Sequence, residues 1–585
     1  MEKSAATEMV NIKINGREYA VPSGITILEA ARIAGIEIPT LCYLKDINEI
    51  GACRICLVEV KGSRSMCAAC VYPVSEGMEV FTNTPRVRAA RKMNLELLLS
   101  IHKKNCLSCI RNTSCELQTL CNEYGVDDEY FSGENREYQL DESTPFIVRD
   151  NNKCILCRRC TAACSNLQEI GVIGAEDRGF DTHIGSPFEM KLAETSCVGC
   201  GQCVVACPVG ALYEKDDTQR VLDAIDDPNK YVVISAAPSV RATIGECFGY
   251  PPGTDVEGKM VAAMKRLGFD GVYNLNFAAD LTIMEEGTEL LHRLENGGKL
   301  PLITSCSPGW IKYCEHYFPE FVDNLSTCKS PQQMFGAVIK TYFAEKNGIA
   351  PEDIFVVSCI PCTAKKFEIG RDGQSAAGVP DVDAAITTRE LARMIKSAGI
   401  NFRELPDEEF DEPFGIGSGA GAIFGATGGV MEAALRTVAE ILLGEKLEKL
   451  DFYDVRGTDG IKRATYKIGD RTIRVAAASG TANAKRLLRA IESGEESYEF
   501  VEIMCCPGGC VNGGGQPTQP ASVRNKLDLP ALRASVLYKA DSEMDLRRSH
   551  ENSAVKRVYD EYFGEPGSHR AHEVLHTFYV KRGIY

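Results

Sequence analysis

Two stretches of this sequence share the same cysteine spacing, and this repeat constrains the fold more than any other feature. Residues 154–164 and residues 197–207 both read C-x₂-C-x₂-C-x₃-C, and a proline follows the second run. The chain has 26 cysteines among 585 residues, and its first residues contain no apolar export signal, so we expect the thiols to stay reduced. Metal ligation, and not disulfide pairing, is therefore the leading explanation for the cysteines.

The two runs predict a pair of 4Fe-4S cubanes within residues 145–216. In bacterial two-cluster ferredoxins, three cysteines of each run bind one cubane and the fourth cysteine binds the other. A structural zinc ion is the alternative, but a tetrahedral single-ion site gives no reason for this crossed spacing. The predicted ligand sets are Cys154, Cys157, Cys160 and Cys207 for one cubane, and Cys197, Cys200, Cys203 and Cys164 for the other.

Residues 1–85 predict a small β-grasp domain with a 2Fe-2S cluster. Val10, Ile12 and Ile14 alternate with polar residues before an Asn-Gly turn, which is typical of a β-hairpin, and a short amphipathic helix follows. Four thiolates on the next loop suit a 2Fe-2S cluster, and this order of elements resembles the ferredoxin module of complex redox enzymes. A zinc loop is the alternative, and Cys67 is a surplus thiol. The predicted ligands are Cys42, Cys53, Cys56 and Cys70.

Residues 86–126 predict a site with mixed ligands. A predicted helix ends at His102, and three cysteines follow it closely. One imidazole and three thiolates can bind either zinc or a 4Fe-4S cluster, and a histidine at a helix end can also be a simple cap. The position between two clearer cluster motifs favours iron and sulfur, because zinc carries no electrons. The predicted ligands are His102, Cys106, Cys109 and Cys115.

The composition changes from about residue 228, and residues 228–525 predict a larger α/β domain. Short apolar runs such as YVVISAA and FVVSC are each followed by cysteine or small residues, and helical patterns separate them. This pattern is typical of a buried parallel sheet, in which ligand sites lie beyond the carboxyl ends of the strands. Cysteines that are far apart in sequence can therefore meet at one site. The final segment, residues 526–585, predicts helices packed around this domain, so the whole chain is expected to be multidomain α+β and α/β.

Composition also excludes several classes of function. The formal net charge is −16 and the pI is about 5.2, which argues against nucleic acid as a partner. No apolar stretch is long enough to span a membrane, so we expect no membrane partner and a cytoplasmic location. No Walker A motif is present, and GIGSGA at residues 415–420 lacks the preceding strand of a dinucleotide-binding fingerprint. Electrons are therefore expected to leave through a partner protein.

The chain resembles the iron-only (FeFe) hydrogenases from end to end. The resemblance is carried by TSCSPGW (304–310), IPCTAKKFE (360–368), FGATGGVMEAALR (424–436) and EIMCCPGGCVNGGGQP (502–517). In that family the cysteines of these segments hold the H-cluster, a 4Fe-4S cubane joined through one thiolate to a two-iron subsite with CO, cyanide and a dithiolate. The resemblance implies that Cys362, Cys506 and Cys510 ligate the cubane, with Cys510 as the bridge.

The first of these segments departs from the family pattern, in which two adjacent cysteines precede Pro-Gly-Trp. In the family the second cysteine ligates the cubane and the first relays protons. Here the pair is Cys306 and Ser307. Three accounts stay open: Cys306 takes the ligand role, Ser307 ligates as an alkoxide or through water, or the site is altered. We favour Cys306 as a metal ligand, because thiolate suits iron-sulfur sites better than a hydroxyl does.

The resemblance also implies roles for residues around the two-iron subsite. A proton path runs from Cys306 through Glu286, Ser326 and Glu289; without the resemblance, two glutamates three residues apart would be interpreted as a solvated helix face. Lys365 is expected to hydrogen-bond a cyanide. The expected lining of the pocket is Ala237, Pro238, Ser239, Ile360 and Met504. Ordinary core packing is an equally good interpretation of the last two.

The implied activity is the reversible reaction 2H⁺ + 2e⁻ ⇌ H₂. The implied cofactors are one 2Fe-2S cluster, three 4Fe-4S clusters and the H-cluster. The implied partners are an NAD(P)-binding flavoprotein with small iron-sulfur subunits, or ferredoxin, together with maturation proteins. Overall resemblance favours the NAD(P)-linked or electron-bifurcating multimeric type. The alternative is a non-catalytic iron-sulfur carrier or a redox or H₂ sensor with the same scaffold, which Ser307 supports.

Overall fold

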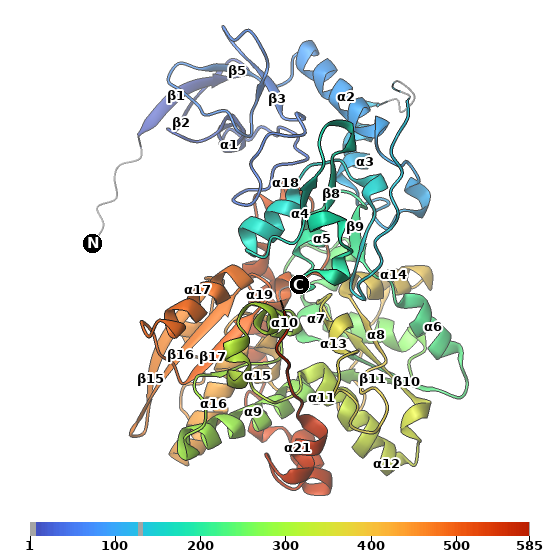
Figure 1. The fold of residues 1–585 in the computed structure, drawn as a ribbon, viewed down its shortest axis with the longest axis vertical. Helices are drawn as coiled ribbons and strands as arrows, with labels where there is room; N and C mark the ends of the chain where they lie inside the picture. Colours follow the sequence, from blue (N-terminus) through green and yellow to red (C-terminus); the bar gives the residue numbers. More distant parts are fainter. Residues whose placement is uncertain (1–7, 127–130, 132, 584–585) are drawn as a thin grey trace.

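The computed structural model describes residues 8–126, 131 and 133–583, and Figure 1 shows how they are arranged. A small N-terminal domain lies at one end, the cysteine-rich segments lie in the middle, and the large α/β domain forms the other end. The prediction of a multidomain chain with mixed helices and strands is confirmed. Among the described helices, none is both long and apolar enough to cross a membrane.

The N-terminal domain is built on a five-stranded sheet in the order β2-β1-β5-β3-β4. The predicted hairpin is present, because β1 (Met9–Ile14) pairs antiparallel with β2 (Arg17–Pro22), and Ile12 and Ile14 are buried. Gly16 in the turn has a φ of +83°, which glycine adopts without strain. The other elements are α1 (Ile27–Ile33), β3 (Leu57–Val60), β4 (Cys67–Ala68) and β5 (Glu79–Phe81).

Two helices connect this domain to the next. Helix α2 (Pro85–Ser100) begins after Thr84, whose side-chain oxygen accepts a hydrogen bond from the backbone N–H of Val87. The helix ends at Ser100, two residues before the end at His102 that the sequence predicted. Helix α3 (Glu116–Tyr124) follows the third cysteine of the segment.

The ferredoxin-like domain repeats one arrangement of cysteine run and short helix. Strand β6 (Ile147–Arg149) pairs antiparallel with β9 (Leu212–Glu214), one at each end of the domain's sequence. Cys160 of the first run lies in one short helix, and Cys203 of the second run lies in the other. The remaining elements are α4 (Arg159–Ala162), α5 (Gln202–Ala206), β7 (Gly174–Glu176) and β8 (His183–Gly185).

The α/β domain contains two four-stranded sheets, whereas the sequence predicted one parallel sheet. The first sheet has the order β11-β10-β13-β14 and is parallel throughout. The second has the order β12-β17-β16-β15, in which β15 is antiparallel to β16. Buried apolar runs look alike whichever sheet they join, so their pattern does not reveal their pairing partners. The strands are β10 (Tyr231–Ala236), β11 (Gly271–Asn274), β12 (Leu302–Ile303), β13 (Ile354–Cys359), β14 (Ala384–Ile386), β15 (Ile461–Ile468), β16 (Arg471–Ser479) and β17 (Phe500–Met504).

Helices surround both sheets and bury their apolar side chains (Figure 1). The largest apolar core lies around β10, β11 and β13. Five helices matter most for the site: the first, second and fifth of them each follow a strand directly, whereas the third and fourth follow other helical segments. They are α9 (Asn276–Asn296), α10 (Pro308–Tyr317), α11 (Pro331–Val338), α16 (Gly429–Leu443) and α17 (Thr481–Glu492).

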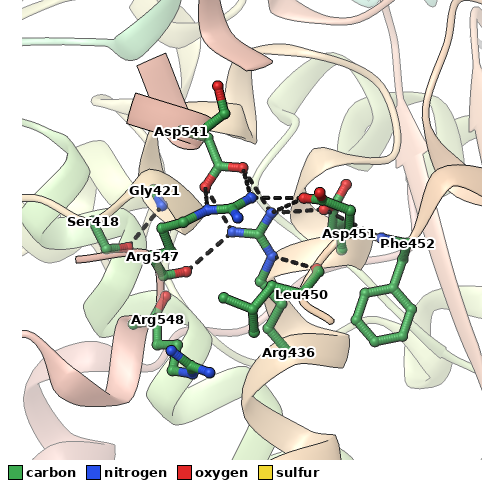
Figure 2. A network of polar contacts seen from close by, with 12 residues as sticks. Ser418, Gly421, Arg436, Leu450, Asp451, Phe452, Asp541, Arg547 and Arg548 are labelled. Carbon is green, nitrogen blue, oxygen red and sulfur yellow. Dashed lines mark hydrogen bonds and ion pairs between the residues drawn. The ribbon is translucent and has the colours of Figure 1, made fainter. Parts of the chain in front are cut away.

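The C-terminal helices α19 (Leu529–Glu543), α20 (Ser553–Val558) and α21 (His569–Leu575) fold back onto the α/β domain. Figure 2 shows the main polar attachment, in which Arg436 Nη1 and Nη2 each lie 2.8 Å from an oxygen of Asp541. Both side chains are fully buried. Removing one partner of such a buried pair typically costs about 3–5 kcal/mol, so the C-terminal segment is an integral part of the domain.

Candidate active site

The eight cysteines of the ferredoxin-like domain surround two separate small cavities. The structure divides the cysteines four and four, and each group takes three members from one run and one from the other. The cavities are enclosed mainly by apolar side chains, which is the setting of a shielded iron-sulfur cluster. One cavity is lined by Cys154, Cys157, Cys160 and Cys207, and the other by Cys164, Cys197, Cys200 and Cys203.

The four predicted ligands of the N-terminal domain also lie together. Cys56 Sγ is 3.3 Å from Cys70 Sγ, and the thiol of Cys42 lies beside those of Cys53 and Cys70. The surplus thiol, Cys67, instead contacts Ser63 Oγ at 3.9 Å. Four thiols in one group, with Cys67 outside it, fit a 2Fe-2S cluster with four cysteine ligands.

The segment between these domains offers one imidazole and three thiols. Burial lowers the pKa of His102, which favours the neutral ring that binds metals. The Nδ1 atom of His102 is buried without a hydrogen-bond partner among the described residues. Cys109 and Cys115 are partly buried and Cys106 is exposed. A buried ring nitrogen with no partner fits a metal ligand better than it fits a helix cap.

A cavity of about 80 Å³ lies where the two sheets of the α/β domain bring the ends of β10, β12, β13 and β17 together. Its wall is almost wholly apolar apart from sulfur. The five residues expected to line the two-iron pocket are all there: Ala237, Pro238, Ser239, Ile360 and Met504. The cysteines of the α/β domain in the wall are Cys306, Cys362, Cys505, Cys506 and Cys510.

The residues around this cavity fit a metal cluster that carries small polar ligands. Ser239 Oγ and Gln332 Oε1 are buried in the cavity region and have no hydrogen-bond partner among the described residues. Leaving a buried polar atom unpaired costs about 1–3 kcal/mol, so two such atoms beside several thiols point to a bound group that pairs with them. The donor set of soft sulfur ligands is the set that iron-sulfur clusters prefer.

Cys200 joins this cavity to the ferredoxin-like domain, because it lines both the large cavity and one of the two small ones. Cys506 Sγ lies 3.8 Å from the carbonyl oxygen of Cys200. The glycine-rich NGGG segment packs at the same place: a Cβ at Gly514 would lie 2.5 Å from that oxygen, and a Cβ at Gly513 would lie 2.1 Å from Pro361 O. Gly514 is therefore required by close contact between backbone segments of the two domains, and Gly513 by a close backbone contact within the α/β domain.

Lys365 provides the positive charge beside the cavity. Its side chain is buried, and Nζ lies 2.8 Å from Glu368 Oε2. Ser330 and Gln332 also donate hydrogen bonds to Glu368, at 2.7 and 2.8 Å. This network holds the ammonium group at the cavity wall, where it can attract a small anion.

A chain of ionisable and hydroxyl side chains leads away from Cys306. Glu286 on α9 is fully buried, and both its carboxylate oxygens lack a hydrogen-bond partner among the described residues. Burial, and then the nearby charge of Glu289, raise the pKa of Glu286 to about 8. Ser326 Oγ donates a hydrogen bond of 2.9 Å to Glu289 Oε2. The predicted proton-path residues therefore lie in one region behind the cavity.

The far end of this chain reaches a partly exposed arginine. Arg293 Nη2 lies 2.6 Å from Glu289 Oε1, one helical turn along α9. On the other side, the hydroxyl of Thr327 lies 2.8 Å from His576 Nδ1, and His576 Nε2 lies 3.0 Å from Glu285. The contact between His576 and Glu285 therefore attaches the C-terminal segment to α9.

Sequence reasoning missed several residues that the structure places at the site. Gln332 and Arg293 carried no motif of their own. Cys505 was left without a role, although it stands directly before Cys506 and lines the cavity. The backbone N–H of Cys505 donates a hydrogen bond of 3.2 Å to Ser307 Oγ. The substitution at Ser307, together with a double cysteine in the last segment, was a signal that could have drawn attention to Cys505.

Four groups of ligand-forming side chains in the first part of the chain, followed by an apolar cavity lined with thiols, define a multi-cluster iron-sulfur oxidoreductase. Profiles of known families match the same modules. The matches are the 2Fe-2S iron-sulfur cluster binding domain over residues 7–85, the iron-sulfur binding region of NADH-ubiquinone oxidoreductase-G over 91–129, the 4Fe-4S dicluster domain over 153–211, the C-terminal domain of the iron only hydrogenase large subunit over 230–514 and the iron hydrogenase small subunit over 528–582.

Whole-chain comparisons agree with these matches. NADP-reducing hydrogenase subunit HndD of Solidesulfovibrio fructosivorans is 49% identical and covers 98% of this chain and 99% of its own length. Iron hydrogenase 1 of Clostridium pasteurianum is 44% identical and covers 98% of this chain and all of its own. A solved structure of an apo FeFe-hydrogenase HydA1 variant from Chlamydomonas reinhardtii is 43% identical, with a TM-score of 0.57, and covers 63% of this chain and 100% of that one.

The chain belongs to the iron-only hydrogenases, as a catalytic subunit that carries its own iron-sulfur domains. The resemblance inferred from the four cysteine-containing and glycine-rich segments is thus confirmed, and so is the prediction of an enzyme. The identification favours the hydrogenase over a non-catalytic carrier or sensor.

Proposed function

We propose that the cavity of the α/β domain holds an H-cluster and that the enzyme interconverts H₂ with protons and electrons there. The observation that carries this proposal is the convergence of thiols from both sheets on one apolar cavity that borders the ferredoxin-like domain. When bound, the group supplies the iron centre at which H₂ is formed or split. Cys362, Cys506 and Cys510 would hold its cubane, and Cys510 would also hold the two-iron subsite.

The other cavity residues orient the group and keep water away from it. The ammonium of Lys365 attracts a small anionic ligand, and the unpaired atoms of Ser239 and Gln332 provide hydrogen bonds. Apolar side chains such as Met504 and Ile360 close the wall. A dry wall strengthens each of these polar contacts, because no water competes for them.

Electrons leave the cavity through the cysteine-rich N-terminal part of the chain, residues 1–216. We call the clusters of this part the front clusters. We propose four clusters there, namely one 2Fe-2S cluster and three 4Fe-4S clusters, one of which has His102 as a ligand. Cys200 supports the order of transfer, because it borders both the large cavity and one of the ferredoxin cavities. The His102 segment and the N-terminal domain extend the route toward the surface, where a partner can dock.

Protons take a different route between the cavity and the surface. Cys306 lines the cavity and exchanges protons with Glu286, which passes them through Ser326 to Glu289, and Arg293 pairs with Glu289 at the outer end of this route. Each step needs a group that can both gain and lose a proton or a hydroxyl that can bridge two such groups. Glu286 meets this requirement, since its raised pKa of about 8 keeps it protonated at neutral pH without making deprotonation costly.

A pH titration should reveal the raised pKa of Glu286. We expect the infrared carbonyl band of its protonated carboxyl group to disappear as the pH rises through about 8. Because proton donation needs the acid form, H₂ evolution at a constant driving force should fall over the same range. H₂ oxidation needs the carboxylate form as acceptor, so its rate should rise there.

Two variants serve as controls for this titration. Glu286→Gln should lack the band altogether. Glu289→Gln should move its midpoint to lower pH, because the charge of Glu289 helps to raise the pKa of Glu286. A band that persists in Glu286→Gln, or a midpoint near the ordinary glutamate pKa of about 4.3, would contradict the assignment.

For electron partners, we propose an NAD(P)-binding flavoprotein with small iron-sulfur subunits, in the cytoplasm where NAD(P) is available. Support comes from the relative named as a subunit of an NADP-reducing hydrogenase, which matches this chain over almost its whole length. Ferredoxin is the alternative acceptor. Maturation proteins are needed to assemble the two-iron subsite.

Two measurements test these proposals. Anaerobic production together with maturation proteins should give infrared bands of CO and cyanide, and their absence from matured protein would remove the H-cluster. Purification from native cells should retain a flavoprotein and NAD(P)H-dependent H₂ evolution, which stops when the flavoprotein is stripped away. Activity that depends on ferredoxin alone, with no flavoprotein retained, would replace the NAD(P) proposal.

A further inference from the structure

The H-cluster proposal leaves the cubane one thiolate short. A 4Fe-4S cubane has four irons, each of which needs a protein ligand. Cys362, Cys506 and Cys510 provide three. The fourth position in the family pattern corresponds to Ser307, and a neutral hydroxyl is a much weaker ligand for iron than a thiolate.

Ser307 is already engaged by the protein. It stands immediately before α10, and its Oγ accepts the hydrogen bond of 3.2 Å from the backbone N–H of Cys505. Ser307 is part of the cavity wall, so the position where the family has its fourth cubane cysteine also faces this cavity. A sulfur atom from a neighbouring residue is needed there.

Cys306 also lines the cavity, but its packing neighbours differ from those of Ser307. Its side chain packs with Met504 and Phe424 in the apolar cluster beside α9 and α16. After burial, the group with the largest influence on the pKa of Cys306 is Glu286, the next residue of the proton path. Cys306 therefore lies beside the proton route, and the proposal below assigns it to that route in place of the cubane-ligand role expected from the sequence.

Cys505 lies next to Ser307, where the sulfur atom is needed. It is buried in the other apolar cluster, with Val198 and Trp310. A Cβ placed on Gly309 would lie 2.8 Å from Cys505 Sγ, so the sulfur sits over the first turn of α10, next to Ser307. The same sulfur is three bonds from the nitrogen that contacts Ser307 Oγ.

The neighbours of Cys505 are thiols, and they belong to the two cluster sites. Its thiol contacts that of Cys200, and Cys506 and Cys362 are the next groups that act on it. The ferredoxin cavity of Cys200 already has four cysteines in its wall, so it needs no fifth ligand. The large cavity has three cubane cysteines and lacks one.

We propose that Cys505 supplies the fourth thiolate of the cubane in place of Ser307, and that Cys306 remains free for proton transfer. This assignment rests on the H-cluster proposal above. On binding, the Cys505 thiol loses its proton and forms one sulfur–iron bond, without any change in oxidation state. Gly309 is required beside it, because a side chain there would occupy the place of the sulfur.

The test uses the full-length chain, produced anaerobically without maturation proteins so that only the cubane forms in the large cavity. Mössbauer and electron paramagnetic resonance spectra of isotopically enriched iron, with the iron content per chain, report each cluster. We expect Cys505→Ala to convert one cubane to a three-iron cluster or to lose it, while the front clusters stay unchanged. Ser307→Ala should leave all clusters intact.

Two further variants separate ligation from folding. The double variant Ser307→Cys with Cys505→Ala should restore the cubane, because it returns a thiolate to the family position. Cys314→Ala, which removes a buried thiol from the same apolar cluster, should change nothing. Both results support a ligand role for Cys505 over a packing role.

The possible contrary results are distinguishable. If Cys505→Ala keeps the full cubane spectrum, or if Ser307→Ala or Cys306→Ala loses it instead, the assignment of Cys505 is overturned and the H-cluster proposal stands. If the wild-type chain shows only the four front clusters, the H-cluster proposal fails and the assignment of Cys505 fails with it.

Discussion

Replacing Glu286 with glutamine is expected to slow H₂ turnover in both directions by about 10²–10⁴-fold, the usual contribution of a general acid or base. The amide has nearly the same shape as the acid but cannot exchange a proton at neutral pH. Glu286 is fully buried, and neither of its carboxylate oxygens has a hydrogen-bond partner among the described residues, so the substitution removes no hydrogen bond there. Film electrochemistry of the matured enzyme measures both directions in one experiment.

The infrared bands and cluster spectra of this variant should match those of the wild type, since Glu286 ligates no metal. Glu285→Gln on the same helix is the matched control: it is equally buried but hydrogen-bonds Tyr559 and His576. We expect it to change turnover by only a few-fold. Equal losses in the two variants would show that the helix, and not the proton path, is disturbed.

Replacing Cys510 with alanine is expected to abolish H₂ turnover and the infrared bands of CO and cyanide together. The proposed role of its thiolate is to be the covalent link between the cubane and the two-iron subsite, so without it the subsite has no protein ligand. The front clusters should keep their paramagnetic signals, because their cysteines lie around other cavities. Infrared spectroscopy and an H₂ assay on matured protein check the result.

Cys359→Ala is the control for this change. Cys359 is buried at the end of β13, three residues before Cys362, but it does not line the cavity. Its loss removes a similar volume from the same region and should leave the bands in place. Retention of the CO and cyanide bands in Cys510→Ala would rule out Cys510 as the bridge.

The front of the chain could be predicted from the sequence because its geometry is local. A cubane is only a few ångströms across, so most of its ligands recur at short fixed spacings such as that between Cys154 and Cys157. These spacings can be recognised in the sequence without knowledge of the fold. The hairpin before Gly16 is local in the same way. The division of the ferredoxin cysteines into two crossed sets followed from one known pattern.

The large cavity could be approached only through family resemblance. Cys306, Cys362 and Cys506 meet because strands of two separate sheets end at the same place. The sequence of a buried strand does not indicate which sheet the strand joins. Gln332 carries no motif, and its free oxygen is visible only once its neighbours are placed. Cys505 was overlooked because a cysteine outside a known motif is more often an inert buried side chain.

The close backbone contact between Gly514 and Cys200 bears on the kinetics of the enzyme. Backbone atoms of Gly514 and Cys200 pack directly against each other, and the Thr363 hydroxyl donates a hydrogen bond to Gly199 O beside them, so the distance across which electrons must tunnel is fixed. Solvent viscosity should then have little influence on this internal transfer. Any slow, viscosity-dependent step in turnover would have to arise at the outer surface, where a redox partner arrives and departs.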